Sequence, residues 1–474
     1  MKVMLLSLPG YQENDGNLFP LGIGYLVGSL KQSHEVKAHH FHKMQYAWQE
    51  ICDKVNSFKP DIIGLTCSTF NRGNVREMIK FLKTNDKNRT IVVGGVHASF
   101  CYEQMLTRYG ADVVVIGEGE NTLKELCNAI EKNLPLMSLK GIAYKENNEI
   151  ILAPPSDPVK NLDDLPMPDH SFALPYVEQS KVGFIITSRG CPVRCTFCST
   201  SSYWGQKVRM YSVARVVDEM EMVISQYKVK KIFFHDDTFN LGIERVKAIC
   251  KEIMDRKLKI EWGCSCRVHP VSEEMIACMV EAGCRHICWG IESGSEEMLK
   301  EINKKISLQQ IRTAFELSKK FPVMSTGAFA MVGNPGESNK TINDTVKFLN
   351  SIPTTDLLSA SILYVLPGTL IYEDLKSKGY IKDEDWSKYD TVPSYTMENS
   401  YLTMLRWAKQ VRDSPLRIPF DPKKHFWYGT MDTSDINVGS NINIYMKKIG
   451  RIITKPRLVV ACFNKLLPSG KIRF

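Results

Sequence analysis

Two stretches of this chain alternate short apolar runs with amphipathic segments, and this alternation constrains the fold more than any other feature of the sequence. The first stretch has apolar runs at 2–8, 34–41, 61–67, 90–95 and 112–117, separated by helix-like segments such as 74–85 and 120–132. Short β-rich runs that alternate with amphipathic helices are typical of a parallel sheet with helices on both faces. Residues 1–150 are therefore expected to form a doubly wound, Rossmann-like α/β domain.

The same alternation returns between 181 and 380. Its apolar runs lie at 183–188, 231–237, 261–267, 286–293, 326–333 and 360–365. Six such β/α units fit an incomplete (β/α)6 barrel of the TIM type. A connector at 151–180 separates the two domains; it holds six of the chain's 22 prolines, and that density opposes regular helix and sheet. The remainder, 381–474, is expected to be a small, mostly helical region with a basic tail.

Three cysteines follow the first run of the expected barrel, in the string CPVRCTFC. Cys191, Cys195 and Cys198 therefore lie near the carboxyl end of a strand, where barrels carry their reactive residues. Three thiolates leave a tetrahedral zinc unsaturated, and they leave a four-iron cluster one ligand short, so that one iron could bind and reduce a substrate. A chance spacing is the alternative, because the chain has 14 cysteines and others, such as Cys264 and Cys266, are expected to pack in the core.

The spacing and setting of these cysteines resemble the radical S-adenosylmethionine (SAM) enzymes. Phe197 stands where that family carries an aromatic residue before its third cysteine. The resemblance implies that Cys191, Cys195 and Cys198 hold a 4Fe–4S cluster whose open iron chelates the methionine end of SAM. The reduced cluster would cleave SAM to a 5′-deoxyadenosyl radical, and its electron would come from a donor such as flavodoxin or ferredoxin.

The next two strand ends carry charged residues. Successive residues of a strand point to opposite faces, so at most one of Asp236 and Asp237 faces the barrel lumen, and the other is expected to cap the following helix. The family carries acidic residues here, near SAM or the substrate. Arg267 ends the third strand, and its guanidinium suits a carboxylate such as that of SAM, with a plain salt bridge as the alternative.

The fourth and fifth strand ends complete the set of SAM-contact motifs. Glu292 and Ser293 resemble the element with which the family binds the ribose, although a serine here can also cap the next helix. Gly333, Pro335 and Gly336 belong to a strand-to-helix turn that the family places against SAM, where backbone amides can approach a ligand. A plain turn is the alternative.

Segments 20–30, 94–99, 117–126 and 364–375 resemble the branch of the family that has an N-terminal cobalamin-binding domain. The resemblance implies cobalamin as a third cofactor, with contacts from Gly94, Gly95, His97, Gly117, Glu118 and Gly119. The chain lacks the string D-x-H-x-x-G, whose histidine binds cobalt in many cobalamin proteins, so no protein histidine is expected below the cobalt. The three histidines in the string HHFHK (39, 40 and 42) are expected at the surface, at a strand edge.

The resemblance favours cobalamin-dependent C-methylation of an unactivated carbon in a small-molecule, lipid or tetrapyrrole-type substrate. One alternative is a cobalamin-linked radical reaction without methyl transfer, similar to that of the anaerobic magnesium-protoporphyrin monomethyl ester cyclase. A radical SAM enzyme with an empty first domain is another. A non-catalytic cobalamin or SAM sensor is the last, and the intact cysteine triad opposes it.

Eight basic residues and no acidic residue lie between 436 and 474, while the net charge of the whole chain is +9. The rest of the chain is therefore close to neutral, which argues against a nucleic-acid partner. The basic tail also carries apolar residues, so it can dock on the barrel, on a partner or on an anionic membrane surface. No apolar run reaches the roughly 18–20 residues of a membrane span, and a reducing cytoplasm with a peripheral membrane contact through the tail is expected.

Overall fold

The computed structural model describes residues 1–414 except for 11–18, 42–43, 175–179, 354–357 and 389–391. The chain divides into two compact units, and each unit draws on several parts of the sequence. The first contains Met1–Tyr176, Ser199–Tyr211 and Leu366–Val392, and the second contains Val177–Cys198, Ser212–Val365 and the chain from Pro393 onward. The domain boundaries expected near residues 150, 180 and 380 stay a prediction.

The first unit is built on a seven-stranded sheet with the order β2-β1-β3-β4-β5-β6-β7. Its first five strands are parallel, and the last two form an antiparallel hairpin. The strands are β1 (Lys2–Ser7), β2 (Glu35–His40), β3 (Ile62–Thr66), β4 (Thr90–Gly94), β5 (Val113–Val115), β6 (Ile142–Glu146) and β7 (Glu149–Leu152). The predicted doubly wound domain is confirmed, with the 2-1-3-4-5 order of one common version of that fold.

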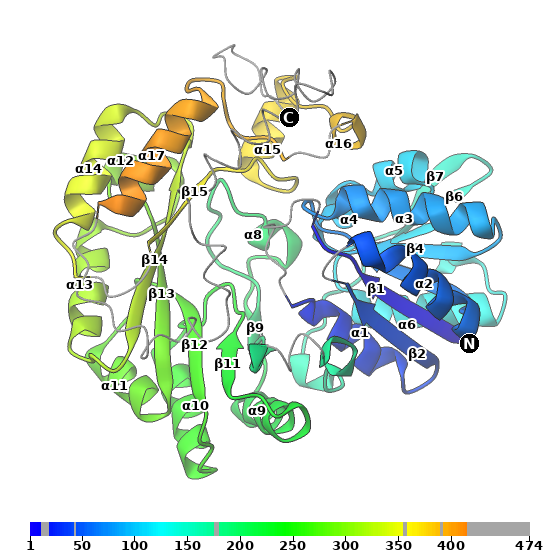
Figure 1. Cartoon of the computed structure of the whole chain (residues 1–474), viewed down its shortest axis with the longest axis horizontal. Helices are drawn as coiled ribbons and strands as arrows, with labels where there is room; N and C mark the ends of the chain where they lie inside the picture. The colour runs from blue at the N-terminus through cyan, green and yellow to red at the C-terminus, as the bar shows by residue number, and fades with distance from the viewer. Residues whose placement is uncertain (11–18, 42–43, 175–179, 354–357, 389–391, 415–474) are drawn as a thin grey trace. The chain divides into compact units, whose positions relative to one another are not determined.

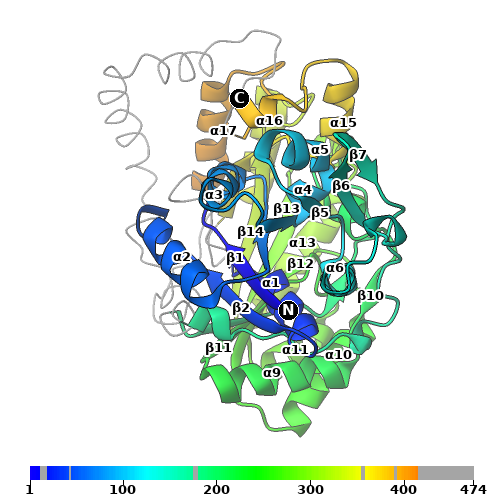
Figure 2. The ribbon, with the colours of Figure 1, turned by 90° about the vertical axis from the view of Figure 1, so that its right-hand side faces the viewer.

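Helices cover both faces of this sheet, because alternate residues of its buried strands supply two separate cores (Figure 1, Figure 2). Helices α1 (Leu21–Leu30) and α6 (Gly119–Glu131) pack on one face, with Ile23 and Leu126 in the core. Helices α2 (Met44–Phe58) and α3 (Arg72–Asn85) pack on the other. The short helices of this unit are α4 (Val96–Phe100), α5 (Tyr102–Gln104), α8 (Thr200–Tyr203), α15 (Leu370–Ser377) and α16 (Asp385–Lys388).

The second unit is built on six parallel strands in the order β15-β14-β13-β12-β11-β8. They are β8 (Val182–Ile185), β11 (Lys231–Phe234), β12 (Glu261–Arg267), β13 (Cys284–Glu292), β14 (Ser325–Val332) and β15 (Leu358–Ile362). Each follows its neighbour in sequence, as in a barrel, and the sheet stays open between β15 and β8. The predicted incomplete barrel is confirmed, and every strand overlaps one of the six apolar runs.

The helices between these strands lie on the outer side of the sheet (Figure 1). They are α9 (Val213–Tyr227), α10 (Ile243–Asp255), α11 (Glu273–Glu281), α12 (Glu296–Glu301), α13 (Leu308–Lys319) and α14 (Asn339–Leu349). Helix α17 (Tyr401–Asp413) packs beside α14, and the Ser400 hydroxyl caps it by accepting a hydrogen bond from the Thr403 amide. The helical region expected after the barrel is thereby confirmed for the described residues, which end at 414.

Within the described residues no helix is both long and apolar enough to cross a membrane. The basic tail at 436–474 lies outside the described residues, as does the third histidine of the HHFHK string. The other two lie half-buried on the edge strand β2, where the pKa of His39 falls to about 4 because burial disfavours its charged form.

Candidate active site

The three cysteines lie on the loop that follows β8, beyond Gly190, whose φ of +102° favours glycine. Cys195 is buried, at 6 % exposed, while Cys191 and Cys198 are half-buried. Two hydrogen bonds hold this loop to the segment after α12. The Thr196 amide donates to the Ile302 carbonyl at 3.1 Å, and the Asn303 side-chain amide donates to the Arg194 carbonyl at 2.7 Å.

Lys304, the next residue of that segment, sits at the centre of the site. It is 7 % exposed, and its Nζ lies 2.7 Å from Oε1 of Glu292 and 6.0 Å from the centre of the Phe197 ring. Its carbonyl oxygen accepts a hydrogen bond of 2.6 Å from Nη2 of Arg267. A single buried lysine thus joins three residues predicted from separate motifs, on the loop, β12 and β13.

Glu292 ends β13 with φ at +64°, a left-handed conformation that costs a non-glycine residue free energy. A register shift between Gly290 and Glu292 precedes it, where β13 pairs with β14. Such bulges redirect side chains next to functional sites. Here the redirected carboxylate meets Lys304, so the strained backbone serves the ion pair.

The thiols have a chemistry that fits an iron–sulfur cluster. Burial raises the pKa of the Cys195 thiol to about 11, and the positive charges of Lys304 and Arg267 act in the opposite direction. A metal that binds here must displace the thiol proton, and these two cations favour the thiolate that results. Among the described residues no three His, Cys, Asp or Glu side chains are arranged to hold a single ion. A four-iron cluster takes one thiolate per iron and does not need such an arrangement.

The two aspartates after β11 differ in their surroundings. Asp236 is 4 % exposed and accepts hydrogen bonds from the Thr187 amide, at 3.0 Å, and from the hydroxyls of Thr187 and Ser188, at 2.8 and 2.5 Å. Burial raises its pKa, and these donors oppose the rise. Asp237 is exposed. The expected cap is wrong, because α10 begins at Ile243 and its N-cap position is held by Gly242, without a side-chain hydrogen bond.

Ser293 and the glycine turn are engaged within the protein. The Ser293 hydroxyl lies 3.1 Å from that of Thr345 and accepts from the Ser295 amide, so it braces the start of α12. In the turn after β14, the amides of Gly333 and Asn334 donate to the carboxylate of Glu337. The Gly336 amide donates to Oε2 of Glu398 at 2.7 Å, beyond Pro335. Burial raises the pKa of Glu337 to about 7.

In the first unit, a cavity of about 120 Å³ opens at the carboxyl ends of the parallel strands. Five of the six residues predicted to contact cobalamin line it: Gly94, Gly95, Gly117, Glu118 and Gly119. Glycine and apolar positions of the sheet and α1 also line it, among them Leu5, Gly22 and Gly64. Glycines leave backbone open to a broad ligand, and ligands of doubly wound sheets bind at this edge. The lining therefore fits a large ligand such as cobalamin that lies against this edge with only part of it inside the cavity.

Tyr203 and Trp204, from the segment after the cysteine loop, also line this cavity. The Tyr203 hydroxyl donates to the Gly117 carbonyl at 2.9 Å. Glu118 pairs with Arg209, and both side chains are less than 10 % exposed. Among the described residues, no histidine lines the cavity.

His97 lies elsewhere in the first unit. It is 1 % exposed, with Nδ1 3.0 Å from the Thr69 hydroxyl and its ring packed edge-on against Trp386 at 5.6 Å. Burial lowers its pKa to about 3, so it is neutral. It does not line the cavity, and its predicted contact with the corrin stays a prediction.

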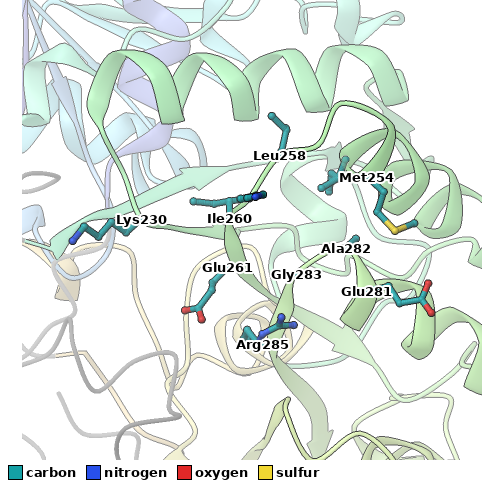
Figure 3. A pocket seen from close by; sticks show the side chains of 11 residues that line it. Lys230, Met254, Leu258, Ile260, Glu261, Glu281, Ala282, Gly283 and Arg285 are labelled. Atoms are coloured by element: carbon teal, nitrogen blue, oxygen red, sulfur yellow. The ribbon is translucent and has the colours of Figure 1, made fainter.

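A larger cavity, of about 390 Å³, lies at the opposite end of the second sheet (Figure 3). Lys230, Glu261, Gly283 and Arg285 are among its lining residues, near the amino ends of β11, β12 and β13. None of the predicted site residues lines it. Residues at that face of a barrel usually contribute to stability, and the catalytic residues lie at the other face.

Sequence reasoning missed Lys304 and the aromatic pair Tyr203 and Trp204. Lys304 stands in the string INKK beside Lys305, which is exposed, and nothing in the string tells the two apart. Tyr203 and Trp204 follow the cysteines by a few residues, and their placement against the first sheet depends on the tertiary fold.

Comparison with known proteins agrees with both halves of this description. A model of the radical SAM superfamily matches residues 185–349, and a model of the B12 binding domain matches residues 13–127. The chain is 33 % identical over 410 residues to an uncharacterized methyltransferase of Pyrococcus horikoshii, covering 85 % of this chain and 88 % of that protein.

Two further relatives are informative. The anaerobic magnesium-protoporphyrin IX monomethyl ester cyclase of Rubrivivax gelatinosus is 26 % identical over 410 residues, covering 83 % of this chain and 73 % of the cyclase. Among solved structures, the radical SAM methyltransferase TsrM of Kitasatospora setae, with tryptophan substrate and a SAM analogue bound, matches with a TM-score of 0.70. It is 21 % identical, over 79 % of this chain and 76 % of TsrM, so it shows the fold alone.

Proposed function

Because the chain belongs to the radical SAM superfamily, in the group with a B12-binding domain, we propose that it methylates an unactivated carbon of a small-molecule substrate. It is an enzyme of the cobalamin-dependent radical SAM class, and its cofactors are a 4Fe–4S cluster, SAM and cobalamin. When bound, the cluster supplies the electron that cleaves SAM, and cobalamin carries the methyl group. The identity of the substrate is set by residues outside the cofactor motifs.

The observation that carries the proposal is the arrangement around Lys304. Its ammonium lies between Glu292 and the Phe197 ring, on the segment that anchors the cysteine loop. A carboxylate, an ammonium and the Arg267 guanidinium next to three thiols offer complementary charges for the amino, carboxylate and ribose groups of SAM. Glu292, already neutralised by Lys304, can accept hydrogen bonds from sugar hydroxyls with little rearrangement.

The glycine-lined cavity of the first unit supports the methyl-transfer part of the proposal. Gly94, Gly117 and Gly119 leave the backbone bare where a corrin or its tail would lie, and Tyr203 and Trp204 add an apolar wall that excludes water. The absence of a lining histidine supports a cobalt without a protein ligand below it, within the described cavity.

A second candidate is a radical reaction without methyl transfer. The similarity to the magnesium-protoporphyrin cyclase favours it, since that relative matches over most of this chain. Both candidates share the cysteine loop and SAM cleavage, and they differ in whether a second SAM is consumed as a methyl donor.

Nucleoside products separate the two candidates. The protein is reconstituted anaerobically with iron, sulfide and cobalamin, reduced, and supplied with SAM and candidate substrates. Substrate-dependent 5′-deoxyadenosine together with S-adenosylhomocysteine is expected for methylation, and 5′-deoxyadenosine alone supports the second candidate. The proposal is overturned if protein with a full cluster forms neither of the two nucleosides.

A pair of cysteine variants tests the cluster assignment. Cys195→Ala should lose iron and SAM cleavage, at least a hundredfold, because the loop then offers only two thiolates. Cys288→Ala is the matched control, since Cys288 is also 6 % exposed but lies within β13. Equal iron content in the two variants would sink the assignment.

Two further proposals concern partners. We propose that the electron comes from a small redox protein such as flavodoxin or ferredoxin, and that the enzyme acts in the cytoplasm, with the tail at 436–474 as a peripheral membrane contact. Sedimentation with anionic vesicles, compared between the full chain and a chain ending at 435, tests the membrane contact. Unchanged sedimentation would remove it.

A further inference from the structure

Phe329 is an exposed aromatic residue in the middle of a buried strand. It is 42 % exposed, while every other residue of β14 (Ser325–Val332) is buried. Its strand lies between β13 and β15, so no sheet edge explains the exposure. Ala328 and Ala330, on either side of it in sequence, are each 2 % exposed, and they point to the opposite face because successive residues of a strand alternate between faces.

The face that carries Phe329 also carries the candidate SAM site. Phe329 is in register with Gly290 of β13, and Gly290 is in register with Arg267 of β12. A Cβ at Gly290 would lie 3.1 Å from Nζ of Lys304 and 3.2 Å from Oε1 of Glu292. Residues in register share a face. Phe329 therefore lies one strand away from Gly290, on the face where Gly290 meets the Lys304–Glu292 ion pair.

Small residues border the ring on both sides. Gly290 has no side chain, and Ser359 of β15, the other in-register neighbour, is exposed and short. Two residues along β15, Ser361 is exposed as well. Neighbouring strands lie about 4.8 Å apart, so the strip from Gly290 to Ser359 is about 10 Å wide across the sheet. The aromatic ring lies in the middle of that strip.

We propose that Phe329 is the platform on which the substrate lies, and that the substrate presents a flat, apolar ring system to it. The strip runs across the strands and is broad, which suits a flat ring better than a linear acyl chain. Stacking on an aromatic ring favours such a partner. The hydroxyls of Ser359 and Ser361 border the platform and can bond a polar substituent of the substrate. This inference rests on the proposed function, because it assigns the substrate class of the same site.

Binding of a flat probe tests the platform without requiring turnover. Pyrene-1-carboxylate, which has a flat ring system and one charge, is measured by equilibrium dialysis against the reconstituted holoenzyme. Phe329→Ala should weaken its binding at least tenfold. Phe329→Trp should keep it within about threefold, because it restores an aromatic face. Ser359→Trp should also weaken it at least tenfold, since a large side chain at this exposed position fills the strip and leaves Phe329 intact.

Controls separate this inference from the proposed function. Tyr380→Ala removes another aromatic residue that is 42 % exposed, and it should leave probe binding unchanged. SAM cleavage without substrate should be the same in Tyr380→Ala and in the unaltered enzyme, since Tyr380 follows α15 in the first unit and not a strand of the second. Loss of cleavage in every variant, including the unaltered enzyme, would count against the proposed function alone.

The platform is ruled out if pyrene-1-carboxylate does not bind the holoenzyme, or if Phe329→Ala binds this probe as tightly as the unaltered enzyme does. The proposal is also overturned if decanoate, a linear carboxylate, binds as tightly as the probe and loses affinity equally in Phe329→Ala, because the platform would then take an acyl chain.

Discussion

At the scale of single residues, two buried carboxylates of the second unit, Glu292 and Asp236, have specific partners. Glu292 has the ammonium of Lys304, and Asp236 has three hydrogen-bond donors from Thr187 and Ser188, which follow β8. Isolated charges are costly to bury, and paired ones are tolerated when their remaining bonds are satisfied. These pairs fix side chains at three strand ends before any ligand arrives.

Replacement of Lys304 tests how much depends on the Glu292 pair. Lys304→Met should lower the stability of the second unit by about 3 kcal/mol, because a largely buried carboxylate is left without its partner. Lys305→Met is the control, since Lys305 is exposed. Urea unfolding, followed by circular dichroism, measures the difference.

A double variant excludes a simple loss of packing. Lys304→Met combined with Glu292→Gln removes both charges and should recover part of the lost stability. If the double variant is no more stable than Lys304→Met alone, the charge explanation is wrong.

At the scale of elements, the turn between β14 and α14 folds around a buried carboxyl group. Glu337 accepts from two amides of its own turn, and it is 4 % exposed. Gly333, at the start of the turn, packs so closely on α17 that a Cβ there would lie 2.6 Å from Sδ of Met404. The turn is thus fixed from within by Glu337 and from outside by α17.

This turn should make stability depend on pH. The pKa of Glu337 is about 7 in the folded protein, against an ordinary 4.5. Between these values the folded state keeps a proton that the unfolded chain releases, so stability is lost as pH rises through this window, by up to about 3 kcal/mol. Glu337→Gln keeps the acceptor oxygen and has no charge, so its stability should fall less between pH 5 and pH 8.

Urea midpoints of the two proteins at pH 5 and pH 8 measure this difference. Glu398→Gln, at an exposed carboxylate that also accepts from an amide of the turn, is the matched control. An identical pH dependence in Glu337→Gln and the unaltered protein would contradict the assignment to Glu337.

The elements also show what the sequence predicts well. All six barrel strands follow from apolar runs, because buried parallel strands read as continuous apolar segments. The hairpin β6–β7 was missed, although Asn147 and Asn148 mark a two-residue turn; both have positive φ, as such turns require. The cysteine loop and glycine turns follow from motifs. Lys304 and Phe329 do not, because their burial and exposure depend on the packing of distant segments.

At the scale of the whole molecule, each unit includes pieces from distant parts of the sequence. Trp386 is fully buried in the first unit, where its carbonyl accepts from Arg72 and Tyr109 and its ring lies 4.8 Å from the Arg72 guanidinium. Its indole N–H donates to the Tyr372 hydroxyl at 2.8 Å. Tyr372 and Trp386 are therefore part of the first unit's core, and the segment at 366–388 is not a peripheral extension.

Two tryptophan variants should therefore destabilise different units. Trp386→Ala should lower the stability of the first unit by about 3–5 kcal/mol, as for other buried large-to-small changes. Trp407→Ala, on α17, should act on the second unit. Hydrogen exchange read by mass spectrometry should rise in α3 and α4 for the first variant and in α14 for the second. Unchanged exchange in α3 and α4 of Trp386→Ala would show that the 366–392 segment is dispensable.

The late position of Trp386 has a consequence for biosynthesis. The last strand of the first sheet ends at Leu152, and the ribosome adds Trp386 more than 200 residues later. At about 5–20 residues per second, that gap lasts roughly 12–47 s. During this time Trp386 does not yet cover Arg72 and His97 in the nascent first unit. We expect chaperones to bind the first unit in this incomplete state. A messenger truncated before codon 366 should yield a product that proteases remove, even though every strand of its first sheet has been made.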